Sequence, residues 1–195
     1  MVFAKSPEPG RVKTRLIPLL GETGAAQLQR QLIERTLCTA VASGLGAVEL
    51  WCAPGPDEAY FSDCAARHPI SLRAQCEGDL GTRMAHAMAE AKPGLLIGCD
   101  CPALTPAYLR EAATALAGGD EAVFGPAEDG GYVLVGVARR PSAELFDAIA
   151  WGRSTVMQET RMRLARGNWR WQELAPLWDV DRPEDLARLQ QLLAR

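Results

Sequence analysis

A group of cationic side chains follows the first few residues of the chain. The four cations are Lys5, Arg11, Lys13 and Arg15. The short apolar run 2–4 before them is typical of a strand, and Gly10 lies between them, in a segment that also holds two prolines. Phosphates are held by backbone N–H groups together with Lys and Arg side chains. The stretch therefore predicts an anion-binding loop, and the alternative is a proline-rich turn with solvated charges.

Two common phosphate loops do not account for this stretch. The Walker loop requires Gly directly before the Lys of a Lys-Ser/Thr pair, and here Val12 precedes Lys13 and Thr14. The dinucleotide pattern Gly-x-Gly-x-x-Gly is absent from the sequence. Any phosphate site here must be of another type.

Asp100 follows the most apolar run of the chain, residues 94–99, and Cys101 and Pro102 come after it. Such a run is typical of a strand buried on both faces. A carboxylate at the end of that strand could bind a hard cation such as Mg²⁺, which prefers oxygen ligands and accompanies phosphates. A turn or helix-capping carboxylate is the other interpretation of the same position.

Asp179 and Asp181 precede a helix that we expect to begin at Pro183. In an extended segment their side chains point the same way. Asp181 could cap the helix, or it could supply a second metal ligand.

Residues 129–132 have the sequence Asp-Gly-Gly-Tyr between two predicted strands. Two glycines there indicate a hairpin turn, and they also allow backbone to approach a ligand closely. Asp129 and Tyr132 would then face an acceptor substrate, beside Gly130 and Gly131.

These residues are positioned by alternating strands and helices. The apolar periodicities predict strands over 2–4, 47–53, 70–75, 94–99, 122–125, 132–137 and 169–173, and helices over 22–43, 57–67, 80–91, 106–116, 143–150, 155–166 and 183–193. Alternation predicts an α/β protein with a mostly parallel sheet covered by helices on both sides, in one domain over 1–195. Ligands of such folds bind at the carboxyl ends of strands, which places Asp79 on the same rim as Lys5–Arg15 and Asp100.

The composition and the net charge indicate which classes of binding partner are not expected. The chain has 195 residues, 48% of them hydrophobic and 23% charged, with a net charge of −3. We therefore expect no general attraction to nucleic acid or to anionic membranes. We also expect no membrane span, no signal peptide and a cytoplasmic location. The six cysteines form no C-x-x-C pair, and with His68 and His86 as the only histidines a zinc site is not expected.

Four segments taken together carry a family resemblance. They are residues 3–16, 98–104, 126–132 and 179–186. In this order, and over nearly the full length, they resemble the DUF2064 family of the nucleotide-diphospho-sugar transferase superfamily. The resemblance implies a three-layer α/β/α domain of the glycosyltransferase A fold. Among characterised enzymes, the order of these motifs is most similar to that in 2-phospho-L-lactate guanylyltransferase, the molybdenum-cofactor guanylyltransferases and the sugar-acid cytidylyltransferases.

The resemblance also implies residue roles. It implies nucleotide contacts for Lys5, Gly10, Lys13 and Arg15. Arg11, in the same loop, and Asp79, on the same rim, are added to these predicted contacts by their positions alone. The predicted metal ligands, for Mg²⁺ or Mn²⁺, are Asp100 and Asp181, and the predicted catalytic residues are Lys13, Arg15 and Asp100. The turn Asp129–Tyr132 is implied to bind the second substrate.

One departure favours one reaction over another. Sugar-transferring members of the fold usually carry an Asp-x-Asp metal motif, whereas here Cys101 and Pro102 follow Asp100. The pattern therefore favours nucleotidyl transfer from a nucleoside triphosphate to a small phosphate- or hydroxyl-bearing acceptor. The alternatives are a glycosyltransferase using a nucleotide sugar and a nucleotide-binding protein without catalysis.

Overall fold

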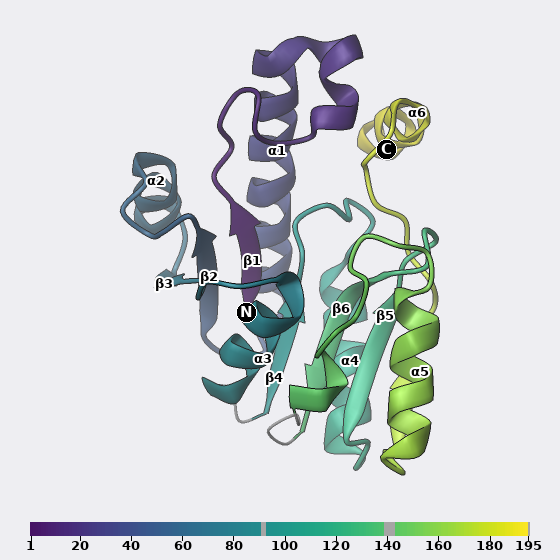
Figure 1. The fold of residues 1–195 in the computed structure, drawn as a ribbon. Coiled ribbons are helices and arrows are strands. Elements are labelled where there is room, and N and C mark those ends of the chain that lie inside the picture. The colour runs from purple at the N-terminus through teal and green to yellow at the C-terminus, as the bar shows by residue number, and fades with distance from the viewer. Residues whose placement is uncertain (91–92, 139–142, 195) are drawn as a thin grey trace. The chain divides into compact units, whose positions relative to one another are not determined.

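The computed structural model describes residues 1–90, 93–138 and 143–194, and its contacts divide the chain into two compact units. Unit 1 comprises Met1, 75–97 and 107–177, and unit 2 comprises 2–74, 98–106 and 178–195. Figure 1 follows the chain from the purple N-terminus to the yellow C-terminal helix. None of the described helices is long and apolar enough to cross a membrane.

Unit 2 contains three parallel strands and most of the residues that were predicted to do chemistry. The strands are β1 (Val2–Lys5), β2 (Val48–Ala53) and β3 (Ile70–Ala74). β2 pairs with both of the others in parallel, in registers that align Val2 with Leu50 and Val48 with Ile70. The first three residues of β1 are buried, which explains why so short an apolar run forms a strand.

The helices of unit 2 are α1 (Ile17–Ala42), α2 (Ala59–Arg67) and α6 (Pro183–Leu193), and a short 3₁₀ turn, η1 (Thr14–Leu16), precedes α1. The helix predicted from Glu22 matches the long part of α1, and a shorter helical piece that precedes it was not predicted. A short helical piece begins at Ile17, and Gly21, with φ 69°, breaks the helix before its long part. Glycine adopts this backbone conformation at little cost, so two helical pieces meet there.

Unit 1 contains α3 (Leu80–Glu90), β4 (Gly94–Ile97), α4 (Pro106–Ala117), β5 (Ala122–Pro126), β6 (Tyr132–Val137), η2 (Ala143–Leu145), α5 (Val156–Arg166) and β7 (Trp171–Glu173). β6 is antiparallel to both β4 and β5, and β7 is parallel to β5. In Figure 1, β6 accordingly lies between β4 and β5. The hairpin predicted at the glycines is confirmed by the antiparallel β5–β6 pair.

The helix predicted over 143–150 is wrong, because the 3₁₀ turn η2 ends at Leu145 and turns follow it. Leu145, Phe146 and Ile149 are buried there, so their spacing reflects packing of a loop rather than a helix face. For the helix predicted over 80–91, the predicted end at Ala91 lies outside the described residues.

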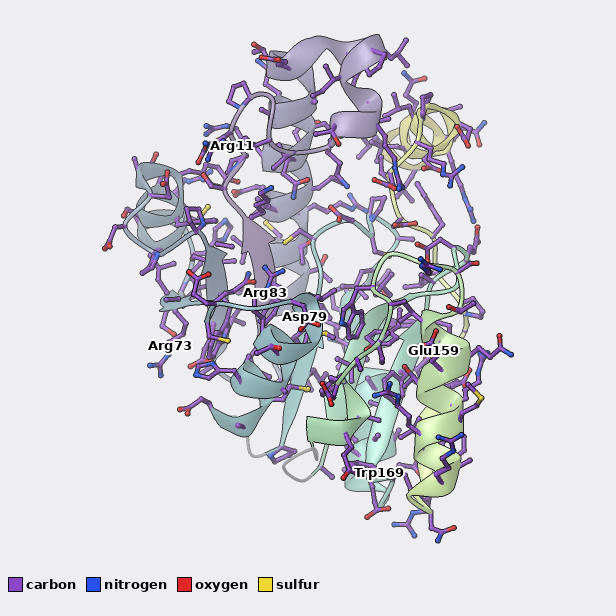
Figure 2. All side chains as sticks on the ribbon, viewed as in Figure 1. Arg11, Arg73, Asp79, Arg83, Glu159 and Trp169 are labelled. Atoms are coloured by element: carbon purple, nitrogen blue, oxygen red, sulfur yellow. The ribbon has the colours of Figure 1, made fainter. Side chains whose placement is uncertain are left out.

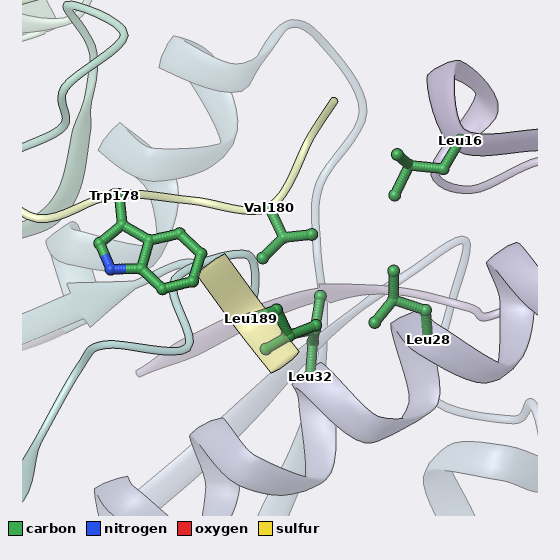
Figure 3. Close-up of a cluster of buried hydrophobic side chains, with 6 residues drawn as sticks. All are labelled: Leu16, Leu28, Leu32, Trp178, Val180 and Leu189. Carbon is green, nitrogen blue, oxygen red and sulfur yellow. The ribbon is translucent and has the colours of Figure 1, made fainter. Parts of the chain in front are cut away.

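A hydrophobic cluster in unit 2 fixes the cationic loop to distant segments (Figure 3). Its members are Leu16, Leu28, Leu32, Trp178, Val180 and Leu189. Leu16 ends the loop, and Val180 lies beside Asp181; both side chains are fully buried. Burying a Leu or Val side chain stabilises a fold by about 1.5–3 kcal/mol. The cluster therefore places Arg15 and Asp181, the neighbours of Leu16 and Val180, close together.

Candidate active site

The loop after β1 is shaped by its own backbone contacts. The Ser6 N–H donates to the Ala53 carbonyl over 2.7 Å, which extends the pairing of β1 with β2 by one residue. The Lys5 ammonium donates to the Arg11 carbonyl over 2.9 Å and closes the loop. Gly10 has φ 77°, a conformation that favours glycine. Lys5 is therefore a loop-closing residue here, and the Arg11 guanidinium, on the exposed side of the loop, pairs with Glu8 at 3.2 Å.

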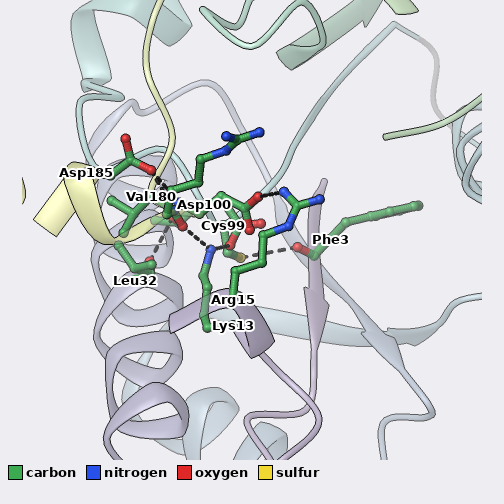
Figure 4. A network of polar contacts seen from close by, with 11 residues as sticks. Phe3, Lys13, Arg15, Leu32, Cys99, Asp100, Val180 and Asp185 are labelled. Carbon is green, nitrogen blue, oxygen red and sulfur yellow. Dashed lines mark hydrogen bonds and ion pairs between the residues drawn. The ribbon is translucent and has the colours of Figure 1, made fainter. Parts of the chain in front are cut away.

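Lys13 connects two segments that are far apart in the sequence (Figure 4). Its Nζ lies 2.6 Å from the Asp100 carboxylate and 2.6 Å from the Val180 carbonyl. The Val180 N–H in turn donates to the Asp100 carbonyl over 2.8 Å. Only 4% of the Lys13 side chain is exposed to solvent, and the Lys13 backbone is left-handed, with φ 48°. A side chain this well buried, on a backbone that costs free energy, fixes the ammonium in one place.

Arg15 forms an ion pair with the Asp181 carboxylate. Both side chains are substantially exposed, at 61% and 40%. The alternative role of Asp181 as a helix cap is taken by another residue: Asp185 accepts from the N–H groups of Asp181 over 3.0 Å and of Arg182 over 2.7 Å. The Asp181 carboxylate is thus directed to Arg15 rather than to the start of α6.

Asp100 stands between two buried thiols. The Cys99 thiol donates to the Phe3 carbonyl at 3.2 Å, which ties the segment to β1. Burial raises the pKa of Cys99 and raises that of Cys101 to about 12. Both groups therefore stay protonated at neutral pH and are poor metal ligands or nucleophiles. The Asp100 side chain, by contrast, is 53% exposed, so the carboxylate is the group of this segment that can meet a ligand.

The two aspartates fit a hard divalent cation. Mg²⁺ takes oxygen ligands and is usually bound through one or two carboxylates together with substrate phosphates. Asp100 and Asp181 offer such carboxylates on segments joined by the Val180–Asp100 hydrogen bond. Each carboxylate is now neutralised by one cation of the loop. A bound ion would share that neutralisation, and Arg15, whose ion pair is exposed, could then turn to phosphate oxygens.

The structure uses Asp79 as the cap of α3. Its carboxylate accepts from the Thr82 N–H and from the Thr82 hydroxyl, each over 2.8 Å. These bonds to the Thr82 backbone and side chain lower the pKa of Asp79. Figure 2 labels Asp79 at the start of α3, beside Arg83. Asp79 belongs to unit 1, and its predicted role as a nucleotide contact remains a prediction.

The turn 129–132, also in unit 1, is closed by its own side chain. The Asp129 carboxylate accepts from the Gly131 N–H over 2.9 Å. Gly130 has φ 92°, and a Cβ there would lie 2.1 Å from the Ser154 carbonyl, so the close approach requires glycine. The Tyr132 ring packs edge-on against Phe124 and Trp151, and burial raises its pKa. Tyr132 is largely a core residue, and its contact with a second substrate remains a prediction.

Two contributors to the network were missed by the sequence analysis. The Val180 carbonyl could not be foreseen, because any backbone carbonyl can accept a hydrogen bond. Asp185 carried a usable signal, since an acidic residue in the first turn after Pro183 is typical of a helix start.

Comparisons with known proteins agree with the fold that the sequence predicted. A family model described as an uncharacterised protein conserved in bacteria, DUF2064, matches residues 36–153. The chain is similar to a candidate nucleotide-diphospho-sugar transferase from Desulfovibrio desulfuricans G20, with 33% identity and a TM-score of 0.88, over 98% of this chain and 85% of that one. This similarity confirms the predicted α/β fold of the nucleotide-diphospho-sugar transferase type.

More distant structures share the fold. A nucleotidyl transferase from Methanothermobacter thermautotroptrophicus aligns at 15% identity and a TM-score of 0.64, over 100% of this chain and 96% of that one. Rv0371c from Mycobacterium tuberculosis H37Rv, in a complex with manganese, aligns at 19% identity and a TM-score of 0.52, over 97% of this chain and 96% of that one. A search of curated proteins returned no match.

Proposed function

We propose a function for a chain that belongs to the DUF2064 family: metal-dependent nucleotidyl transfer from a nucleoside triphosphate to a small phosphate- or hydroxyl-bearing acceptor, with release of pyrophosphate. One observation carries the proposal. Two cations of the loop after β1 and two aspartates from segments 87 and 166 residues further on meet in one network. Convergence of this kind gathers the groups that a metal-bound triphosphate requires.

Each residue has a definite task in this proposal. Asp100 and Asp181 would hold Mg²⁺ or Mn²⁺, which, when bound, would polarise the phosphoryl oxygens and offset their charge. Arg15, on an exposed and flexible side chain, would turn from Asp181 to the phosphates, and Arg11 lies on the exposed side of the same loop. Their positive charges would stabilise the negative charge that develops on the phosphate and on the leaving pyrophosphate.

Lys13 has a more limited freedom. An ammonium carries three N–H donors, and Asp100 and Val180 use two of them among the contacts of the described residues. One donor would be available to a phosphate oxygen while the other two keep Asp100 in position. The acceptor then attacks in line, and no protein nucleophile is required, because the chemistry consists of positioning and electrostatics.

Two related proteins support the choice of reaction and metal. The distant neighbour from Methanothermobacter is named as a nucleotidyl transferase, and the mycobacterial neighbour was crystallised with manganese. The candidate sugar transferase from Desulfovibrio favours the second function, in which the same metal would steady a nucleoside diphosphate leaving a sugar.

Product analysis separates these functions. The protein would be incubated with each common nucleoside triphosphate or nucleotide sugar, Mg²⁺ or Mn²⁺, and a panel of phosphorylated and hydroxylated acceptors. Pyrophosphate release from a triphosphate is the expected result. Nucleoside diphosphate release from a nucleotide sugar would instead establish the glycosyltransferase, and tight nucleotide binding without turnover across the panel would establish a non-catalytic binding protein.

The control is a pair of matched substitutions. Asp100→Asn should abolish the metal-dependent reaction, whereas Asp57→Asn, at an exposed aspartate before α2, should leave it unchanged. Full activity of Asp100→Asn would remove Asp100 from the metal site.

A further inference from the structure

Three side chains of unit 2 with different donor atoms meet away from the Lys13 network. Glu34 and Cys38 come from α1, and His68 directly follows α2. Glu34 and Cys38 are four residues apart, which places them on one face of the helix. One carboxylate oxygen, the thiol sulfur and one imidazole nitrogen all lie within 4.8 Å of one another. We propose that Glu34, Cys38 and His68 bind a borderline-soft divalent transition-metal ion, with Zn²⁺ as the representative ion.

The donor set decides the class of ion. Sulfur, imidazole nitrogen and carboxylate oxygen are the three ligand types of protein zinc sites, whereas Mg²⁺ takes oxygen ligands. The site is therefore chemically distinct from Asp100 and Asp181, and it does not depend on the proposed transferase activity. It lies entirely within residues 34–68 of unit 2.

The carboxylate is already oriented for this role. His68 Nε2 lies 2.6 Å from Glu34 Oε1, while the Arg67 guanidinium lies 3.2 Å from Glu34 Oε2. Arg67 is itself held by the Asp63 carbonyl, at 3.1 Å. Hydrogen bonds of this kind to a ligating carboxylate fix its orientation in metal sites. Arg67 thus leaves the other oxygen facing the imidazole.

Insertion of an ion requires only a small adjustment. With metal–ligand bonds near 2.0–2.1 Å, two ligands of a tetrahedral zinc are about 3.4 Å apart. The Nε2–Oε1 pair would therefore open by less than about 1 Å. The ring proton would move to Nδ1, and the thiol would lose its proton to solvent, as coordinating thiols do.

The charges balance in spite of the neighbouring arginine. Arg67 opposes a cation, but the Glu34 carboxylate and the coordinated Cys38 thiolate supply two negative charges against the two positive charges of the ion. The Arg67 charge therefore lies beside a metal ion and two anionic ligands whose charges sum to zero.

A cavity lies beside one ligand of the site, Glu34. It has a volume of about 550 Å³ and is lined by Glu34, Arg67, Tyr60 and Arg30 among others. Three protein ligands leave the fourth position of a tetrahedral ion to water or another small ligand. The cavity borders Glu34 and has room for such a ligand.

Cobalt substitution tests the proposal with a signal that only sulfur ligation produces. Co²⁺ bound to a thiolate gives a near-ultraviolet charge-transfer band that carboxylate sites lack. We expect one equivalent of Co²⁺ to produce this band. Zn²⁺ should then abolish the band by displacing Co²⁺, whereas excess Mg²⁺ should leave it unchanged. Cys38→Ser should abolish the band, and His68→Gln should weaken Co²⁺ binding at least about tenfold.

Two controls separate this site from others. Cys76→Ser removes another accessible thiol, and Asp100→Asn removes the proposed transferase metal ligand; both should keep the band. A second measurement uses the unaltered protein: Zn²⁺ should slow alkylation of Cys38, resolved by mass spectrometry, and not that of Cys76. Absence of the band in the unaltered protein, its persistence in Cys38→Ser, or unchanged alkylation of Cys38 would each overturn the proposal.

Discussion

Lys13 and Arg15 leave the same loop two residues apart, and each reaches an aspartate from a distant segment, yet their surroundings differ. The Lys13 side chain keeps 4% of its exposure and bonds both a carboxylate and a carbonyl. The Arg15 side chain keeps 61% and is paired with one carboxylate. Removing the contacts of a buried charged side chain is costly, whereas pairs of two exposed side chains contribute about 0–1 kcal/mol. The difference indicates that Lys13 holds the site together and that Arg15 is free to move to a ligand.

Lys13→Met should have the largest effect, because it alters both structure and charge. It leaves the Asp100 carboxylate and the Val180 carbonyl without their shared donor. We expect the free energy of unfolding to fall by about 1–3 kcal/mol and turnover to fall by roughly 10²–10³-fold. Denaturant unfolding and the pyrophosphate assay measure the two effects.

The control for Lys13→Met is Arg166→Met, at an exposed cation near the end of α5. It should change the free energy of unfolding by less than about 0.5 kcal/mol. A Lys13→Met protein as stable as the unaltered one would contradict the holding role of Lys13.

Arg15→Met should separate activity from stability. Because the ion pair with Asp181 is exposed, its loss should cost less than about 1 kcal/mol in the free energy of unfolding. Turnover should still fall by roughly 10²–10³-fold, if Arg15 meets the phosphates. The same two assays apply, and a variant with full turnover would show that Arg15 only pairs with Asp181.

Asp185→Ala should lower stability more than it lowers turnover, which is the opposite of Arg15→Met. Its carboxylate accepts two N–H groups at the start of α6, and losing such a cap costs about 0.5–2 kcal/mol. Thermal unfolding should register this loss, while turnover should change less than in Arg15→Met. Glu184→Ala, at the exposed neighbouring residue, is the matched control and should be close to neutral.

The smallest effect is expected in unit 1, at the exposed pair of Arg161 and Glu173. The hydrogen bond from Arg161, assisted by Trp171, lowers the pKa of Glu173. A carboxylate with a lowered pKa contributes stability above its ordinary pKa and loses it as the pH falls. Glu173→Gln should therefore cost less than about 1 kcal/mol at neutral pH.

The pH dependence provides the check on that pair. Stability curves of Glu173→Gln and the unaltered protein should converge when the pH falls below the ordinary carboxylate range. A difference that persists in acid would show that packing, rather than charge, is lost.

The sequence was informative where chemistry and periodicity agreed. The apolar run before Asp100 and the cations around Gly10 indicated both the fold and the network, because parallel strands carry ligand-binding residues at their carboxyl ends. The sequence was less informative where one residue type serves two purposes. Asp79 fits a ligand contact and a helix cap equally well, and only its bonds to Thr82 show the cap.

Contacts between distant residues account for the rest of what was missed. Glu34 and Cys38 are recognisable as neighbours on a helix, but His68 joins them only through the path of the chain from α1 to the end of α2. The sequence analysis expected no zinc site because the cysteines form no C-x-x-C pair and only two histidines are present. Likewise the apolar spacing over 145–149 suggested a helix, since burial of a loop produces the same local pattern.

The most direct test of the account is Mn²⁺ binding followed by electron paramagnetic resonance in the presence of a nucleoside triphosphate. We expect one tightly bound Mn²⁺ ion per chain, and we expect its binding to be lost or strongly weakened in both Asp100→Asn and Asp181→Asn. Unchanged Mn²⁺ binding in the two variants would contradict it.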